Sequence, residues 1–273
     1  MDTNLWNQMS AGVLRQRAAS GAPVLLPVGA TEQHGPHLPT GVDDFLAAEA
    51  CRRTAALMAE RGRPVVVAPS VWCGLSEHHM GFGGTFTLSL PTYHALLRDL
   101  CGSVRRAGFR RLLIVNGHGG NVLALGAIGH ELSRELDLDI AVTSYFTAAE
   151  GRIAEILESR DTLMHACEGE TSMMMAAYPD LVDHARIAEA TGPDISLQSR
   201  PDHFVQQSRP FDAVTPTGVA GDARPATSAK GNAMLDACAA AMADWLIQWG
   251  SPTDDHGGTT TTRETSVRAG SAS

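Results

Sequence analysis

The stretch Pro23-Val-Leu-Leu-Pro-Val-Gly-Ala-Thr-Glu-Gln-His-Gly-Pro-His-Leu-Pro-Thr-Gly-Val-Asp-Asp-Phe45 decides the fold that the sequence predicts. It opens with a short apolar run, residues 24–28, which is typical of a buried strand. Gly29 ends this run, and a helix is expected to begin near Asp43. The loop between them therefore follows the carboxyl end of a strand, where binding sites of α/β proteins usually form.

This loop and the start of the helix carry imidazoles and carboxylates. The residues of this kind are Glu32, His34, His37, Asp43 and Asp44. Glu32 and His34 are separated by one residue, so an extended backbone would point both side chains the same way. Such groups are ligands for zinc, manganese or iron, and the prolines of the loop stiffen it. The stretch indicates a metal site, although a solvated connection is the ordinary alternative for such a composition.

The rest of the chain alternates between strand and helix patterns. Further strands are expected at 64–69, 111–115 and 139–145, and helices at 5–18, 43–61, 93–104, 125–136, 148–157 and 228–249. This alternation predicts an α/β fold of three layers, α/β/α, with a mainly parallel central sheet. Residues 1–250 are expected to form one domain. Residues 251–273 are rich in Gly, Ser, Thr and charge, and a disordered tail is expected there.

A second loop with site chemistry follows the strand at 111–115. It reads Asn116-Gly-His-Gly-Gly-Asn121, so His118 is placed at a strand's carboxyl end as Glu32 is. Glycines there allow a ligand or metal to approach the backbone closely. A phosphate-binding turn is the alternative, but the spacing matches neither of the common glycine-rich phosphate motifs.

Two other stretches carry candidate groups. Residues 76–85 form a glycine-rich loop with two adjacent histidines, which is expected beside the first loop. Residues 164–178 contain His165, Glu168 and Glu170 before a helical pattern. Glutamates at a helix start are favoured by the helix dipole whatever their function, so capping is an alternative for both. The run Met173–Met175 is typical of a core.

Composition excludes several classes of protein. The chain has 273 residues, of which 44% are hydrophobic, and a formal charge of −9, which argues against nucleic acid as a partner. No signal peptide and no membrane-spanning run is recognisable. The five cysteines form no Cys-x-x-Cys pair, so neither a disulfide framework nor a thiolate zinc site is expected. A cytoplasmic protein that acts on a small molecule is predicted.

Residues 191–226 are polar and rich in proline, with little periodicity, and suggest a lid or an oligomer contact. Their apolar residues, Ile195, Phe204, Phe211 and Val214, lie in no periodic element that could bury them within one subunit. Because exposed apolar groups usually find a partner surface, a homo-oligomer is expected.

Together, the motifs resemble the creatininase family of metal-dependent amidohydrolases. The resemblance is carried by Glu32-Gln-His-Gly, Asp43, Asn116-Gly-His-Gly-Gly-Asn121, His165 and Glu170-Thr-Ser, in this order. It covers roughly residues 5–250 and implies the α/β/α fold, a hexamer, and two divalent ions per chain (zinc, manganese or iron). By this resemblance Glu32, Asp43 and His118 would hold one ion. His34 and Asp43 would hold the second, with Asp43 bridging.

The resemblance also implies roles in catalysis. His165 would transfer protons to the leaving nitrogen, with Glu170 as a catalytic group or a further metal ligand. The expected substrate-binding residues are His79, Gly119, Gly120 and Asn121.

Some positions depart from creatininase itself. The carboxylate expected two residues after His118 is replaced by Gly120, and the creatinine-binding tryptophans align with Phe146 and Asp161. Creatinine is therefore an unexpected substrate. The sequence favours hydrolysis of a non-peptide carbon–nitrogen bond in an amide, cyclic amide or formamide. The alternatives are a metallopeptidase that trims a peptide-derived cofactor precursor and a catalytically silent metal-binding oligomer.

Overall fold

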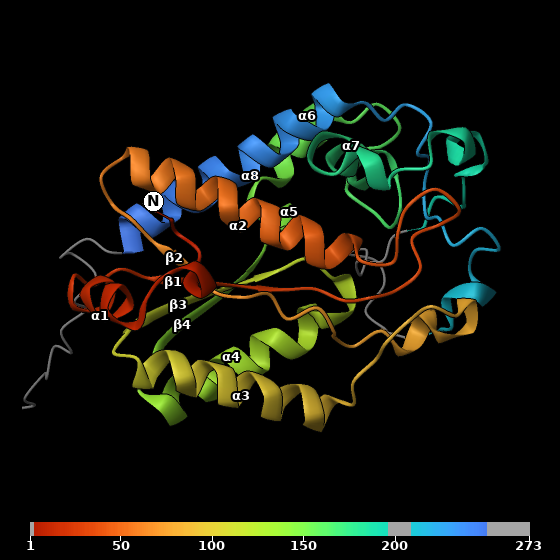
Figure 1. Ribbon diagram of the computed structural model, residues 1–273. Helices are drawn as coiled ribbons and strands as arrows, with labels where there is room; N and C mark the ends of the chain where they lie inside the picture. The colour runs from red at the N-terminus through yellow and green to blue at the C-terminus, as the bar shows by residue number, and fades with distance from the viewer. Residues whose placement is uncertain (1–2, 196–208, 250–273) are drawn as a thin grey trace, which may run out of the picture.

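The computed structural model describes residues 3–195 and 209–249, and its centre is a four-stranded parallel sheet (Figure 1). The strands lie in the order β2-β1-β3-β4. Their bounds are β1 (Val24–Val28), β2 (Val66–Val67), β3 (Arg111–Asn116) and β4 (Asp139–Ser144). Strand β1 pairs with β3 through five residues, from Val24 opposite Leu112 to Val28 opposite Asn116.

Helices cover both faces of this sheet, which confirms the three-layer α/β/α prediction. One face carries α2 (Val42–Glu60), α5 (Tyr145–Ala148), α6 (Glu150–Ile156), α7 (Glu168–Ala177) and α8 (Ser228–Trp249). The opposite face carries α3 (Leu90–Arg106) and α4 (Val122–Leu136), and α1 (Ala11–Ala19) lies at the edge. Short 3₁₀ helices are η1 (Trp6–Gln8), η2 (Glu77–Phe82), η3 (Gly119–Asn121), η4 (Pro179–Leu181), η5 (His184–Glu189) and η6 (Phe211–Ala213).

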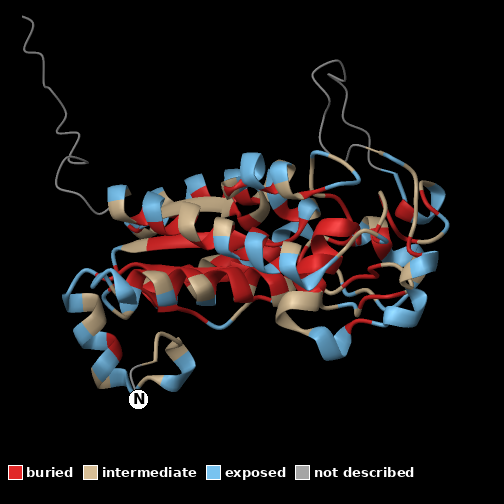
Figure 2. Ribbon diagram, turned by 90° about the horizontal axis from the view of Figure 1, so that it is seen from above, coloured by how far each residue is buried: buried red, intermediate tan, exposed pale blue. Residues whose placement is uncertain are grey.

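The strands are apolar throughout because they supply two cores. Alternate side chains of a strand point to opposite faces. Leu25 and Leu113 therefore pack with α2 and α8 in one core, while Leu26 and Ile114 pack with α3 and α4 in the other. The buried residues form a continuous layer along the middle of the molecule (Figure 2). All five cysteines are buried and free.

The strand order fixes where a site can form. From β1 the chain crosses through α2 to β2, and from β2 it returns through α3 to β3 on the other side of β1. The loops after β1 and β3 thus diverge to opposite faces. Ligands of open α/β sheets bind at such a switch point, outside the carboxyl ends of the strands.

Some expected element bounds were wrong. The first helix is split into η1 and α1, because Ser10 caps α1 by accepting a hydrogen bond from the Val13 amide. The strand expected at 64–69 shrinks to two residues. The helix expected at 148–157 is α6, and the additional short helix α5, which was not expected, precedes it. Among the described residues, no helix is both long and apolar enough to cross a membrane.

The expectation for residues 191–226 was wrong at Phe211. Its side chain is buried within its own chain, against Met164, Cys167 and Ala220. Phe204 and the tail from 251 onward lie outside the described residues.

Candidate metal centre

Two glycines bring the strand ends onto the first turn of α2. A Cβ on Gly29 would lie 2.5 Å from the Asp44 amide nitrogen, and one on Gly117 would lie 2.2 Å from the Asp43 carbonyl oxygen. Neither position tolerates a side chain without moving backbone. Because β1 and β3 end against this turn, Asp43 projects between the two loops that follow them.

Asp43 lies between two imidazoles. Its Oδ1 is 3.1 Å from His34 Nε2, and its Oδ2 is 3.0 Å from His118 Nδ1. The carboxylate of Glu32 completes the group, with Oε1 at 3.3 Å from His118 Nδ1. All four side chains are buried. The structure thus brings together the four metal-ligating residues that lead the sequence prediction.

Backbone carbonyls determine which nitrogen of each ring faces the cluster. His34 Nδ1 lies 3.1 Å from the Glu32 carbonyl oxygen, and His118 Nε2 lies 3.1 Å from the Leu75 carbonyl oxygen. A carbonyl only accepts, so these nitrogens carry the hydrogen. The remaining nitrogens, His34 Nε2 and His118 Nδ1, point at Asp43. Metal-ligating histidines are oriented in the same way.

The charges of the cluster are out of balance without a cation. Burial opposes charge on His34, but Asp43, Glu170 and Glu32 outweigh it and raise its pKa to about 9. Asp43 Oδ2 and both carboxylate oxygens of Glu32 are buried without a hydrogen bond inside the described ranges. Buried carboxylates are normally paired or bound to metal. These residues therefore fit a divalent ion.

The potential ligand atoms fall into three groups of converging residues. The groups are Glu32, His34 and His165; Glu32, His78 and His118; and His34, Asp43 and Glu170. Glu170 therefore lies within reach of the same centre as His34 and Asp43. His78 was noted in the sequence only as one of two loop histidines, and its place beside Glu32 and His118 was not predicted.

His165 lies on the turn before α7, and Glu170 lies in the first turn of that helix. His165 Nε2 donates to the Gln33 carbonyl oxygen at 2.8 Å, so Nδ1 is free and lies 3.6 Å from Glu32 Oε1. Burial and the nearby His34 hold the pKa of His165 well below its ordinary value. Glu170 accepts from the Ala166 amide, and burial followed by the charge of Asp43 raises its pKa to about 7 despite His34. Ala166, at φ 54°, holds this turn in the left-handed region.

Gln33, which the sequence prediction missed, connects the loop after β1 to η2 and to residue 218. Its Oε1 accepts from the Gly35 amide, and its Nε2 lies 3.0 Å from His79 Nδ1 and 3.1 Å from the Gly218 carbonyl oxygen. His79 Nε2 then faces Glu32 Oε1 at 3.3 Å. Only glycine fits at 218, where φ is +73° and a Cβ would lie 1.9 Å from Gln33 Oε1. Short-range sequence patterns gave no signal for this contact.

Phe211 covers the two histidines of this network. Its ring centroid lies 4.5 Å from that of His79 and 5.0 Å from that of His165. An apolar ring there excludes water from one side of the centre.

The remaining predicted site residues lie around this centre. Asn121 is bound to the scaffold: its Oδ1 accepts from the Leu75 amide and its Nδ2 donates to the Gly29 carbonyl oxygen. Gly119 has open space around it, whereas Gly120 lies against His118. His37 belongs to none of the converging groups, and its Nε2 lies 2.7 Å from Thr171 Oγ1.

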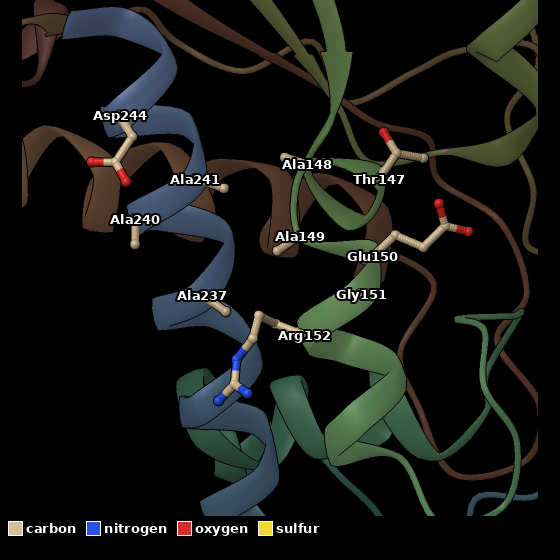
Figure 3. A pocket seen from close by; sticks show the side chains of 10 residues that line it. All are labelled: Thr147, Ala148, Ala149, Glu150, Gly151, Arg152, Ala237, Ala240, Ala241 and Asp244. Carbon is tan, nitrogen blue, oxygen red and sulfur yellow. The ribbon is translucent and has the colours of Figure 1, made fainter.

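A surface hollow of about 590 Å³ lies elsewhere, between α8 and the α5–α6 junction (Figure 3). Half of its lining residues are alanines, and its charged residues are Glu150, Arg152 and Asp244. It contains no histidine or cysteine and none of the residues of the buried cluster, so it offers no comparable metal-binding chemistry.

The chain is similar to several known proteins. The chain is 34% identical over 230 residues to the mycofactocin precursor peptide peptidase of Mycolicibacterium smegmatis, covering 83% of this chain and 85% of the relative. It is 30% identical over 272 residues to creatinine amidohydrolase of Pseudomonas putida, covering 91% and 96%. A solved structure titled "Creatininase Mn" superposes with a TM-score of 0.76 at 27% identity, covering 92% of this chain and all of that one.

A creatininase variant of the Zn-Zn type superposes almost as well, with a TM-score of 0.75. The sequence profile named Creatininase, described as creatinine amidohydrolase, matches residues 7–246. That match spans the sheet, both helical layers and every residue of the buried cluster. The chain belongs to the creatininase family.

Proposed function

We propose that this protein is a hydrolase that uses two divalent metal ions to cleave a carbon–nitrogen bond in a small amide, cyclic amide or formamide. The observation that carries the proposal is the position of Asp43 between His34 Nε2 and His118 Nδ1, with the buried carboxylate of Glu32 3.3 Å from the same His118 nitrogen. Zinc, manganese or iron would suit these nitrogen and oxygen donors.

Each metal position would have its own ligands. Glu32 and His118 would hold one ion, and His34 with Glu170 the other, while Asp43 would contact both. Glu170 would supply the carboxylate that Gly120 cannot provide. When bound, such ions polarise a carbonyl oxygen and lower the pKa of water to about 7, which gives a nucleophile at neutral pH.

A side chain of the protein would transfer the proton during the reaction. His165 is neutral, and its free Nδ1 faces the cluster while Nε2 is held by the Gln33 carbonyl oxygen. It can accept a proton at Nδ1 and return it to the leaving nitrogen, as a general base and then a general acid. Phe211 shields this exchange from bulk water. The substrate would lie near His79, Gly119, Gly120 and Asn121.

Creatinine is not the proposed substrate, because Gly120, Phe146 and Asp161 replace the groups expected for its binding. A screen of amides, lactams and formamides on metal-reconstituted enzyme tests the proposal. Turnover of one class at kcat/KM above about 10⁴ M⁻¹s⁻¹, lost on removal of the metals, is expected. Efficient turnover of creatinine, or activity that survives complete removal of the metals, would refute it.

A peptidase is the second candidate. It is supported by the relative that carries the name of a precursor peptide peptidase. The same ligand set serves a peptide amide, so only the substrate differs. Short synthetic peptides included in the screen distinguish the two candidates.

We also propose that the chain acts in the cytoplasm as a homo-oligomer, a hexamer by family resemblance. Large apolar side chains on the surface support the oligomer. Trp72 and Phe86 are 52% and 59% exposed and pack edge to face. Light scattering at micromolar concentration tests it, and a monomer would contradict it.

A further inference from the structure

The absence of a side chain at position 120 makes room for a particular ring. A Cβ on Gly120 would lie 2.4 Å from His118 Nε2, 2.5 Å from the Leu75 carbonyl oxygen and 2.8 Å from His78 Cε1. All three separations are shorter than a Cβ atom tolerates. The ring of His78 therefore occupies the space that a side chain at this position would need.

His78 lies on η2 and stacks on His118. The two ring centroids are 5.6 Å apart, with an angle of 18° between the planes. A ring nitrogen of His78 lies within 4.8 Å of the ligand atoms of both Glu32 and His118. Within residues 3–195 and 209–249, neither nitrogen of His78 forms a hydrogen bond.

The neighbouring histidine differs in this respect. His79 Nδ1 is within hydrogen-bond distance of Gln33 Nε2, and its Nε2 faces Glu32 Oε1. Both nitrogens of His79 are therefore engaged in orienting other side chains. Of the two adjacent histidines, His78 is the one with nitrogens available to a ligand.

We propose that His78 is a direct metal ligand, which completes one of two separate ligand triads. Glu32, His78 and His118 form the first triad, and His34, Asp43 and Glu170 form the second. The two triads share no residue, and Asp43 Oδ2, at 3.0 Å from His118 Nδ1, lies between them. This inference rests on the proposed metal dependence and names a ligand that the sequence prediction did not contain.

The two triads differ in chemistry. Two imidazoles with one carboxylate are a ligand set of catalytic zinc sites. One imidazole with two carboxylates is richer in oxygen, which suits manganese better. The two positions are therefore inequivalent, and the triad with His78 is the one that selects zinc or iron.

Stepwise metal binding tests the assignment. Metal-free protein, prepared with a chelator, is titrated with zinc in competition with a chromophoric chelator. His78→Phe keeps a planar ring to stack on His118 but removes both nitrogens, and His78→Ala removes ring and nitrogens together. The matched control is His94→Ala, a histidine of α3 whose Nε2 lies 3.5 Å from Glu131 and which belongs to none of the ligand groups.

Two sites are expected in wild type and in His94→Ala. Both His78 variants are expected to weaken one site by more than about 100-fold, because even groups that only orient a ligand contribute 10–100-fold. The second site should remain. Circular dichroism and the Tm of the metal-free variants establish that the fold is intact, and if His78→Ala does not fold, His78→Phe decides.

Wild-type metal affinity at both sites in His78→Phe would overturn the proposal, since stacking on His118 alone would then explain the position of the His78 ring. Loss of both sites in a folded variant would also overturn it, because His78 would not belong to one triad. Failure of the wild-type protein to bind zinc or manganese at all is a different result, and it would refute the proposed function itself.

Discussion

Asp43→Asn is the sharpest test of the metal centre. The substitution keeps the shape of the side chain and removes its charge. In the folded protein the carboxylate lies within 3.1 Å of two imidazole nitrogens from different loops. If Asp43 contacts both ions, the single change must weaken both sites together.

The expected loss of metal affinity and of Tm follows from the shared position of Asp43. We expect each site to weaken by at least about 100-fold, since groups that merely orient a ligand contribute 10–100-fold. This equals ~2.7 kcal/mol per site and ~5 kcal/mol for both. A ligand that binds only the folded state stabilises it through its binding free energy. The metal-loaded protein should therefore lose ~10–20 °C in Tm, at about 2–4 °C per kcal/mol for a domain of this size.

The metal-free protein should respond differently. Burial opposes the charge of Asp43 in the metal-free protein, but His34 and His118 outweigh it and hold the pKa of Asp43 below its ordinary value. His34 can release its proton and become neutral when Asp43 is replaced, which avoids an unpaired buried charge. The Tm of metal-free Asp43→Asn is thus expected to stay near that of the metal-free wild type.

Elemental analysis and thermal unfolding, with and without metal, measure both effects. Asp44→Asn is the matched control, because Asp44 is the next residue of the same helix but belongs to none of the ligand groups. Two tightly bound ions in Asp43→Asn would refute the shared position. An equal fall in Tm for the metal-free and loaded forms would show that Asp43 only supports the fold.

His165→Ala should lower kcat by about 10²–10⁴-fold, the usual contribution of acid–base catalysis, with both metals retained; kinetics and metal analysis on one sample check this, and loss of metal would make His165 a ligand instead. Metal affinity should rise with pH up to about 9, because the carboxylates near His34 overcome burial and raise its pKa to about 9, so a proton must leave before metal binds. Calorimetry in buffers of different ionisation enthalpy measures the number of protons released on metal binding. The absence of proton release at neutral pH would contradict the expected rise of metal affinity with pH. Lys230→Met should cost about 1.5–3 kcal/mol of unfolding free energy in urea, because Lys230 Nζ lies 2.6 Å from the buried Glu168 carboxylate. Burial raises the pKa of Glu168, but hydrogen bonds from Lys230 and Ser159 outweigh it and hold the pKa below 4.5, so this stabilisation is present above that pH and is lost as the pH falls further. A Lys230→Met variant as stable as the wild type near pH 7 would refute this prediction.

The centre of the fold could be predicted because local patterns and a topological rule agree. An apolar run followed by glycine located β1 and β3, and parallel strands place their carboxyl ends at one edge of the sheet. The positions of Glu32, His34 and His118 at this edge follow from that rule alone. Asp43 follows from the helix start nine residues after His34, where α2 begins against both strand ends.

Other contacts depend on side-chain direction or on packing between distant segments. Successive residues of a 3₁₀ helix point about 120° apart, so the sequence could not tell whether His78 or His79 faces His118. Phe211 lies in a stretch without periodicity, and its burial depends on contacts with residues of the α7 turn. Gln33 stands between two predicted ligands, and no local pattern distinguishes a spacer from the hydrogen-bonding link that it forms.

The parallel pairing of β1 with β3 has a consequence for the proposed binding of metal ions. The ligands after β1 and the ligand after β3 come together only when these two strands, distant in the chain, lie side by side. Contacts of such long sequence separation form slowly during folding. The proposed ions would therefore not nucleate the structure, as ions do in small zinc-dependent domains. They would bind late, to a completed scaffold, and the identity of the metal would be set by its supply and affinity after folding.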